Sequence, residues 1–152
     1  MIVELEKLKS MLIHKDKQNL KISARGVDWH IDHSLRVIIS ICRILKKSDL
    51  KKYKKNINIP RSILFRVGWM PRGRAKAPDA VNTTGQIDME AVHLNFEKAN
   101  QELSEINHLP PNSHFKHFVF GRLNLKEAKR FIELHTRHHL KIMEDIIRSL
   151  EV

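Results

Sequence analysis

The sequence predicts a single all-α domain, a four-helix bundle in which a long crossover joins the second helix to the third. Three observations lead to this prediction. Apolar residues recur with helical spacing in four segments, no segment shows a convincing strand pattern, and one long irregular stretch separates the second segment from the third. The chain has 152 residues, a usual length for one domain, so we expect residues 1–152 to share one core.

Two helices are predicted in the N-terminal third of the chain. Leucines recur at helical spacing over residues 1–15, which predicts the first helix. The second helix is predicted over residues 28–49, with Asp28 as its N-cap. The inward-facing stripe of this second helix is expected to contain Trp29, His33, Val37, Ser40, Ile41 and Ile44.

The stretch 48–86 is expected to be irregular, because it contains Pro60, Gly68, Pro71, Gly73, Pro78 and Gly85. Most loops are short, so a connection of this length is expected to be functional or to cross the bundle. The third helix is predicted over residues 88–106, and the prolines at positions 110 and 111 prevent it from continuing. Its apolar positions, at spacings of three and four, are Val92, Phe96, Ala99, Leu103 and Ile106.

The fourth helix has a clear start signal. Asn124 is followed three residues later by Glu127, which resembles a capping box. The helical pattern then continues to about Leu150, so this helix is expected to be roughly 40 Å long.

The fourth helix carries "HTRHH", three histidines in five residues. At about 100° per residue, His135 and His139 fall on the apolar stripe that faces the bundle, and His138 lies at its edge. His33 faces inward from the second helix. Buried imidazoles need partners, and these are either carbonyls and carboxylates or a metal ion. Three inward histidines from two helices are enough for a metal site with three protein ligands and an open position.

Several stretches resemble the DinB/YfiT-like superfamily, and within it a subfamily of unknown function. They are "DWHIDHSL", "HFVFGRLNLKEAKRFIELHTRHHLKIMEDI" and the "RGRAKAP" loop, and the resemblance covers nearly the whole chain. It implies a four-helix bundle with a crossover and a metal-dependent enzyme, in which His33, His135 and His139 hold zinc or nickel. Some members are transferases that use low-molecular-weight thiols, so the resemblance also implies a thiol cofactor.

Two positions depart from the pattern of that superfamily. Many relatives have a glutamine three residues after the last ligand, whereas this chain has Ile142, so any contact of that glutamine with a substrate is missing here. The turn before the last helix often reads His-Pro ahead of its Phe-Gly. Here His117 is followed by Phe118, which we expect to change only the shape of the loop.

An ion with an open position suits a hydrolase or a thiol-dependent transferase that acts on a small molecule. No general base is evident. In the zinc-protease pattern a glutamate directly follows the first histidine, whereas here Thr136 follows His135. Asp32 is expected to face outward. A thiol bound to the ion needs less help from a protein base, which favours the transferase. Cys42 is expected to be a buried packing residue rather than a nucleophile.

The loop "WMPRGRAKAPDAVNTTG" contains Arg72, Arg74 and Lys76 and no acid before Asp79. These cations either form a lip that binds an anionic group of a substrate, or belong to a solvated surface loop. His117 precedes the last helix, where it either lines the mouth of the pocket or lies on the surface.

The charge of +11 is concentrated in the first half of the chain, which invites an anionic partner. Nucleic-acid binding is therefore the alternative function, and "KKSDLKKYKKN", with six lysines in eleven residues, is its best candidate. A solvated linker explains this run better, because no nucleic-acid-binding motif accompanies it and aromatic residues are few. We therefore do not expect nucleic acid as a partner from the sequence.

The protein is expected to be cytoplasmic and not to span a membrane. The longest uncharged apolar run, "VIISIC", is far shorter than the ~20 residues of a membrane-spanning helix. The N-terminus lacks the pattern of a secretory signal, and a single cysteine suits a reducing compartment. Helical bundles commonly form homodimers through helix faces, so a homodimer is an open prediction with no interface assigned.

Overall fold

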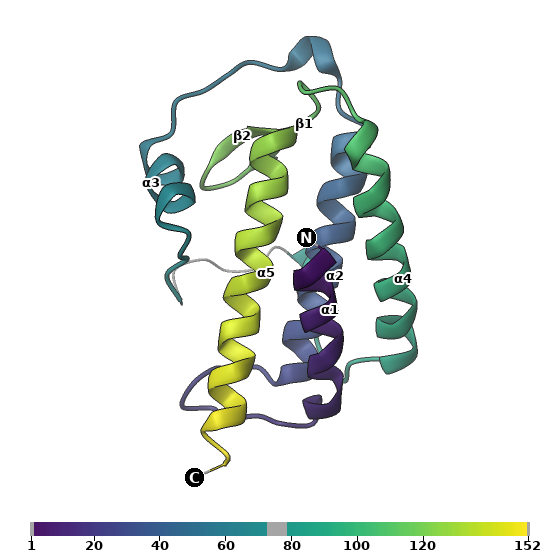
Figure 1. The fold of residues 1–152 in the computed structure, drawn as a ribbon, viewed down its shortest axis with the longest axis vertical. Helices are drawn as coiled ribbons and strands as arrows, with labels where there is room; N and C mark the ends of the chain where they lie inside the picture. The colour runs from purple at the N-terminus through teal and green to yellow at the C-terminus, as the bar shows by residue number, and fades with distance from the viewer. Residues whose placement is uncertain (1, 73–78, 152) are drawn as a thin grey trace.

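The structure is a computed structural model that describes residues 2–72 and 79–151 (Figure 1). The helices are α1 (Ile2–Ser10), α2 (Val27–Lys46), α3 (Ile59–Val67), α4 (Met89–Glu105) and α5 (Leu125–Arg148). A two-stranded antiparallel sheet, made of β1 (His114–His117) and β2 (Gly121–Asn124), lies between α4 and α5 in the chain. Short 3-10 turns occupy Met11–His14, Leu50–Lys52, Asp79–Val81 and Ile106–His108. The predominance of helix agrees with the predicted all-α class.

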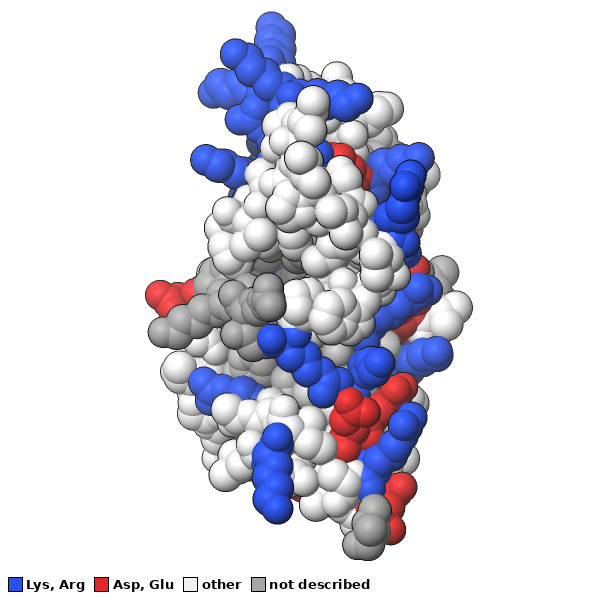
Figure 2. Space-filling view, turned by 90° about the vertical axis from the view of Figure 1, so that its left-hand side faces the viewer, with Lys and Arg blue, Asp and Glu red and all other residues white. Residues whose placement is uncertain are grey.

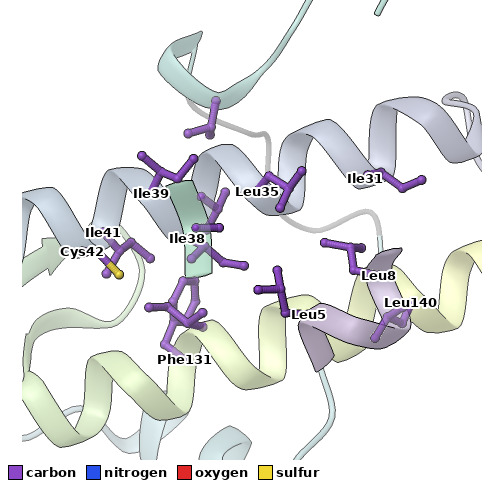
Figure 3. Packing of buried hydrophobic residues seen from close by; sticks show 14 of the residues in the cluster. Leu5, Leu8, Ile31, Leu35, Ile38, Ile39, Ile41, Cys42, Phe131 and Leu140 are labelled. Atoms are coloured by element: carbon purple, nitrogen blue, oxygen red, sulfur yellow. The ribbon is translucent and has the colours of Figure 1, made fainter. Parts of the chain in front are cut away.

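The core forms around α2, which packs against both α4 and α5, while α1 lies against α5. Figure 3 shows Leu5 and Leu8 of α1 pointing toward Leu35 of α2 and the side chains of α5. These leucines, Ile38 and Phe131 are all at most 6% exposed. Burial of each such side chain contributes roughly 1.5–3 kcal/mol. This packing holds α2 and α5, the two helices that carry the candidate ligands, in a fixed register.

The start of α5 confirms the predicted capping box. The Asn124 side chain accepts a hydrogen bond from the Glu127 amide at 2.9 Å, and the Glu127 carboxylate accepts one from the Asn124 amide at 3.0 Å. The start of α2 differs from the prediction, because its N-cap is Gly26 rather than Asp28. Asp28 lies in the first turn, where its carboxylate accepts a hydrogen bond from the Trp29 amide at 2.7 Å and suits the positive end of the helix.

The predicted inward stripe of α2 is correct in its middle and wrong at its C-terminal end. Val37 and Ile41 are buried, but Ile44 is 47% exposed. Ile44 borders an open groove between α2, α4 and the β1–β2 hairpin, and none of the described elements covers it.

The predicted irregular crossover contains one helix, α3, that the sequence interpretation missed. Pro60 and Gly68, which were interpreted as loop residues, lie at the two ends of this helix. Asn58 caps α3 by accepting a hydrogen bond from the Arg61 amide at 2.8 Å, and Pro60 occupies the first turn, where a missing amide proton costs nothing. Gly68 ends α3 with a φ of 72°, a left-handed conformation that favours glycine.

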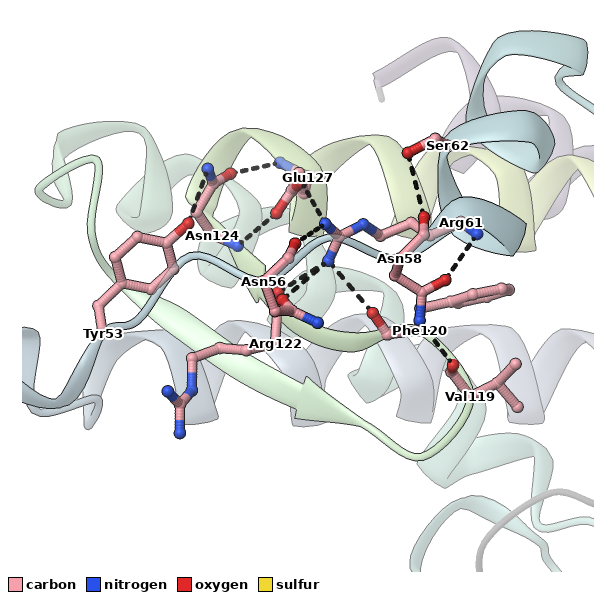
Figure 4. A network of polar contacts seen from close by, with 10 residues as sticks. All are labelled: Tyr53, Asn56, Asn58, Arg61, Ser62, Val119, Phe120, Arg122, Asn124 and Glu127. Atoms are coloured by element: carbon pink, nitrogen blue, oxygen red, sulfur yellow. Dashed lines mark hydrogen bonds and ion pairs between the residues drawn. The ribbon is translucent and has the colours of Figure 1, made fainter.

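A buried arginine fastens the crossover to the hairpin and to α5 (Figure 4). The Arg61 guanidinium donates hydrogen bonds to the carbonyls of Asn56, Phe120 and Arg122 at 2.7, 3.2 and 2.9 Å. It also lies 3.2 Å from the Glu127 carboxylate. One side chain therefore joins the crossover to the stretch 120–127, about 60 residues further along the chain.

The segment after α4, predicted to be without strands, forms the β1–β2 hairpin with His117 paired to Gly121 at its closed end. Gly121 has a φ of 70°, which the turn requires and which most residues avoid. The described helices include none with the length and apolar character needed to cross a membrane.

Candidate metal centre

Three histidines converge at the interface of α2 and α5. The Nε2 atoms of His33 and His135 are 3.3 Å apart, and those of His135 and His139 are also 3.3 Å apart. One ring nitrogen from each of the three histidines lies within 4.8 Å of the other two. The sequence predicted this set, because residues four apart on α5 share one face and His33 lies on the facing stripe of α2.

The spacing of these nitrogens matches the coordination shell of a small divalent ion. Zinc binds imidazole nitrogen at 2.0–2.1 Å, so two ligands of a tetrahedral site lie about 3.3–3.4 Å apart. Both the His33–His135 and the His135–His139 distance, at 3.3 Å, have this value. The three histidines therefore lie within metal-binding distance of one another.

A backbone carbonyl orients His33. Its Nδ1 lies 2.8 Å from the carbonyl oxygen of Val81, which can only accept, so the proton of the neutral ring is on Nδ1. Nε2 then presents its lone pair to the other two histidines. Trp29 stacks on the same ring, with centroids 4.7 Å apart and planes 6° from parallel, which fixes its tilt.

A second histidine, His30, orients His139. Their Nδ1 atoms are 2.9 Å apart, and Nε2 of His30 lies 3.0 Å from the Ser23 hydroxyl. When His139 donates its Nδ1 proton to His30, His30 donates its Nε2 proton to Ser23, and Nε2 of His139 is left with a lone pair. The sequence interpretation missed His30, although it lies three residues before His33 and so on a neighbouring part of α2.

The third candidate ligand, His135, has no such hydrogen-bond partner in the described part of the chain. Its Nδ1 is buried and has no hydrogen-bond partner among the described residues, although the residue as a whole is only half-buried. The Nε2 atoms of His33 and His139 both carry lone pairs. Without a metal ion, a single Nε2 proton of His135 would have to be donated to both of them, each at 3.3 Å. A cation among the three nitrogens satisfies all of them, so these residues fit a divalent metal ion.

Burial keeps the cluster neutral. It lowers the pKa of His33, His135 and His139 below their ordinary value of 6.5, and the charges of neighbouring histidines lower the pKa of the last two further. Burial also lowers the pKa of His30 to about 3. Because metals bind the neutral imidazole, all three ligands are ready to coordinate at neutral pH.

Asp32 does not face outward as predicted. It is 2% exposed, and its carboxylate accepts hydrogen bonds from the Arg36 guanidinium at 2.7 Å and from the Thr83 hydroxyl. The reason is that the chain around Thr83 folds over this side of α2, where the helical wheel alone predicts solvent. The Thr83 carbonyl also accepts a hydrogen bond from the Trp29 indole at 3.0 Å. These contacts hold the segment whose carbonyl orients His33.

His138 has a different partner from the other two histidines of "HTRHH". Its Nδ1 lies 3.1 Å from the carbonyl oxygen of Met70. This contact ties the start of the predicted anion-binding loop to α5. Arg72, two residues further, reaches the Asp145 carboxylate at 2.5 Å, and its charge lowers the pKa of both His30 and His138. Arg72 therefore lies against the face of α5 that carries His138 and Asp145.

The other two cations predicted for this loop, Arg74 and Lys76, lie outside the described residues. The remaining candidate, His117, is half-buried between aromatic rings. Its Nδ1 accepts hydrogen bonds from the amides of Val119 and Phe120 at 3.1 and 3.2 Å, which places its own proton on Nε2.

One aromatic ring separates His117 from the metal ligands. Phe131 lies 4.7 Å from His117 and 5.6 Å from His135, measured between ring centroids. Burial lowers the pKa of His117 to about 4. Cys42 is fully buried, as predicted, and burial raises the pKa of its thiol to about 12, which leaves it unreactive.

Comparison with known proteins adds no family to this geometry. The chain matches no protein-family model, no curated protein and no solved structure.

Proposed function

We propose that the protein is a divalent-metal-dependent enzyme that acts on a small molecule, with zinc or nickel held by His33, His135 and His139. The observation that carries the proposal is the convergence of three neutral Nε2 atoms, two pairs of them at 3.3 Å. The four-helix bundle expected from the DinB/YfiT-like resemblance belongs to the same proposal, since it places ligands on the facing helices α2 and α5.

An open coordination position distinguishes a catalytic site from a structural one. The metal-ligating cluster among the described residues contains three histidines and no fourth ligand. His33 and His139 are buried and His135 is half-buried, and we propose that a substrate reaches the open position from the side of His135. A divalent ion held there lowers the pKa of a water molecule or thiol that binds it and polarises a substrate oxygen.

The transferase is favoured over the hydrolase, because the described residues place no carboxylate in the cluster to act as a base. Asp32, the nearest acid in the sequence, is occupied by Arg36 and Thr83. A low-molecular-weight thiol that loses its proton on binding the ion needs no such base. His117, with its proton on Nε2, lies one aromatic ring away from His135, and we propose that it donates a hydrogen bond to the substrate.

An anionic group on the substrate or the thiol suits Arg72. Its guanidinium is exposed and is held beside α5 by Asp145. Arg74 and Lys76 follow it in the sequence, and we propose that all three cations contribute to binding the anion.

Metal titration of untagged protein tests the proposal. Wild-type protein should bind about one zinc or nickel ion per chain. His33→Ala, His135→Ala and His139→Ala should each abolish this binding while the helical circular dichroism persists. His138→Ala, a change in the same motif, and His93→Ala, a change at an exposed position of α4, are the matched controls and should bind the ion as wild type does.

Two results would contradict the proposal. One is a wild-type protein that binds neither ion. The other is equal loss of binding in His138→Ala, which would mean that the helix surface rather than the cluster holds the metal. Once binding is established, a screen of thiol-dependent transfer and of hydrolysis separates the two reactions.

A further inference from the structure

A groove of about 700 Å³ runs between α2, α4 and the β1–β2 hairpin. No acidic residue is among the described residues that line it, and its cations come from three separate elements. They are Arg36, Arg43, Lys47, Lys98, Lys116 and Arg122. Because α2, α4 and the hairpin each contribute only some of these cations, the cluster cannot be seen in the sequence of any one of them.

Four of these six cations have no carboxylate partner within the described part of the chain. Arg36 is paired with Asp32 at 2.7 Å, and Arg43 approaches Glu102 at 3.4 Å. Lys47, Lys98, Lys116 and Arg122 have no such ion pair among the described residues. Figure 4 shows the guanidinium of Arg122 pointing away from the buried polar network of Arg61. The groove is therefore an electropositive surface, and four of its cations are available to pair with an anionic ligand.

The groove is separate from the candidate metal centre. The turn Asp79–Val81 lies between them, because Ala80 lines the groove while the carbonyl of Val81 orients His33. Binding in the groove therefore makes no use of the three metal ligands.

The positive surface continues past the end of α2. Ser48 lines the groove, and the chain runs from there into Lys51, Lys52, Lys54 and Lys55, which are all exposed. Figure 2 shows lysine and arginine side chains gathered at the upper end of the molecule, where Figure 1 places this segment. Arg36 and Lys47 alone are eleven residues apart on one helix, or about 16 Å, so the charges form a row rather than a point.

Aromatic rings lie where the groove meets the lysine run. Tyr53, in the middle of the four lysines, packs against His114 with ring centroids 5.5 Å apart. His114 lines the groove, and both residues are only half-buried. A ring pair beside a row of cations is the combination that single-stranded nucleic-acid sites use, since bases stack on rings and phosphates follow the charges.

We propose that this groove and the adjoining lysines bind single-stranded nucleic acid, with a base against the Tyr53–His114 pair. The length of the row suits a chain of phosphates better than a compact anion. The groove between α2, α4 and the hairpin would accommodate a single nucleic-acid strand, whereas a duplex would contact only the edges of the groove. The lysine run alone did not support this partner in the sequence, because the groove that completes it is assembled only by folding.

Fluorescence anisotropy with a labelled oligodeoxythymidylate of about 15 nucleotides tests the proposal. The triple variant Lys98→Gln, Lys116→Gln, Arg122→Gln should weaken binding by about tenfold or more and reduce the slope of log affinity against log salt by about 2. The matched control Lys9→Gln, Lys21→Gln, Lys141→Gln removes the same charge from exposed positions outside the groove and should retain nearly full affinity.

A second pair of variants tests the stacking surface. Tyr53→Ala should weaken binding by about tenfold, the typical effect of removing one stacked ring. Tyr53→Phe keeps the ring and loses only the 3.5 Å contact from Asn124 to the hydroxyl, so it should bind as wild type does.

Four results would overturn the proposal. The first is no oligonucleotide binding by the wild type at low salt, and the second is tighter binding of a duplex of the same length. The third is equal loss of affinity in the groove variant and its matched control, which would mean diffuse charge attraction. The fourth is groove-dependent binding of inorganic triphosphate without oligonucleotide binding, which would make the ligand a compact anion.

Discussion

At the scale of single residues, the hydrogen bond between His30 and His139 decides which nitrogen of His139 is available. Because the Nδ1 atoms face each other at 2.9 Å, one ring must donate and the other accept. The Ser23 hydroxyl, 3.0 Å from Nε2 of His30, can donate or accept and so satisfies either arrangement. A metal ion at Nε2 of His139 would select the one in which His139 donates its Nδ1 proton. In the proposed metal site His30 is thus a positioning residue for His139, and such partners commonly raise metal affinity by about 10–100-fold.

Replacing His30 should therefore weaken the metal site without emptying it. His30→Phe keeps a ring of similar size but removes the acceptor for His139, so zinc affinity should fall by about 10–100-fold with the stoichiometry unchanged. Competition titration against a chelator measures the change. Unaltered affinity would show that Nδ1 of His139 needs no partner, and a loss of helical circular dichroism would assign His30 to folding instead.

His117 makes folding stability depend on pH in a defined window. Its pKa is about 4 in the folded protein against an ordinary 6.5, so the unfolded chain binds more protons between these values. The free energy of unfolding should therefore rise as the pH increases from about 4 to about 6.5. The stability that the neutral, buried His117 provides is lost as the pH falls through the same window. His117→Phe should show a shallower slope in metal-free urea denaturation at several pH values, whereas an unchanged slope would contradict the assignment.

The convergence of the three histidines could be predicted from the sequence, because helical spacing puts His135 above His139 and His33 on the facing stripe. Their hydrogen-bond partners could not. Val81 comes from a segment 48 residues away from His33, and the outward position expected for Asp32 was overruled by the same segment. Contacts of this kind depend on the path of the crossover, which has no periodic signal.

At the scale of elements, the Arg61 network decides how the crossover is attached. Arg61 is 6% exposed, and its guanidinium donates hydrogen bonds to carbonyls of both the crossover and the hairpin, beside the capping box of α5 (Figure 4). Loss of this side chain leaves buried acceptors unsatisfied, which costs about 1–3 kcal/mol for each group that water cannot reach.

Arg61→Ala should accordingly lower the free energy of unfolding by about 2–3 kcal/mol. Arg66→Ala, an exposed arginine on the same helix, should change it by less than about 0.5 kcal/mol. Chemical denaturation of both variants measures the difference. Equal effects of the two changes would mean that the network adds nothing beyond helix propensity.

The elements themselves were predicted unevenly, for a physical reason. The long helices α2, α4 and α5 have a sustained apolar period, and the capping box located the start of α5 correctly. The short α3 leaves Ile59, Ile63 and Val67 exposed, and Leu64 and Phe65 pack against the core. Two neighbouring residues are too few to give a helical period. The hairpin has strands of four residues each, too short for an alternating pattern to identify.

At the scale of the whole molecule, the two proposed sites lie on either side of the turn Asp79–Val81. The metal cluster uses the face of α2 toward α5, and the basic groove uses the face toward α4 and the hairpin. The sequence revealed the excess charge but not its location, because the groove joins cations from distant segments. The three histidines of the first site lie on two helices, which is why their convergence could be predicted.

X-ray absorption spectroscopy of the untagged, zinc-loaded protein tests the central claim most directly, since it reports the atoms that surround the ion. Three imidazole nitrogens at about 2.0–2.1 Å, with an additional light ligand, are the predicted result. The same spectrum from His135→Ala protein should show fewer imidazoles or no bound zinc. A shell of oxygen ligands without histidine, or an identical spectrum from the variant, would contradict the assignment of His33, His135 and His139 as the metal site.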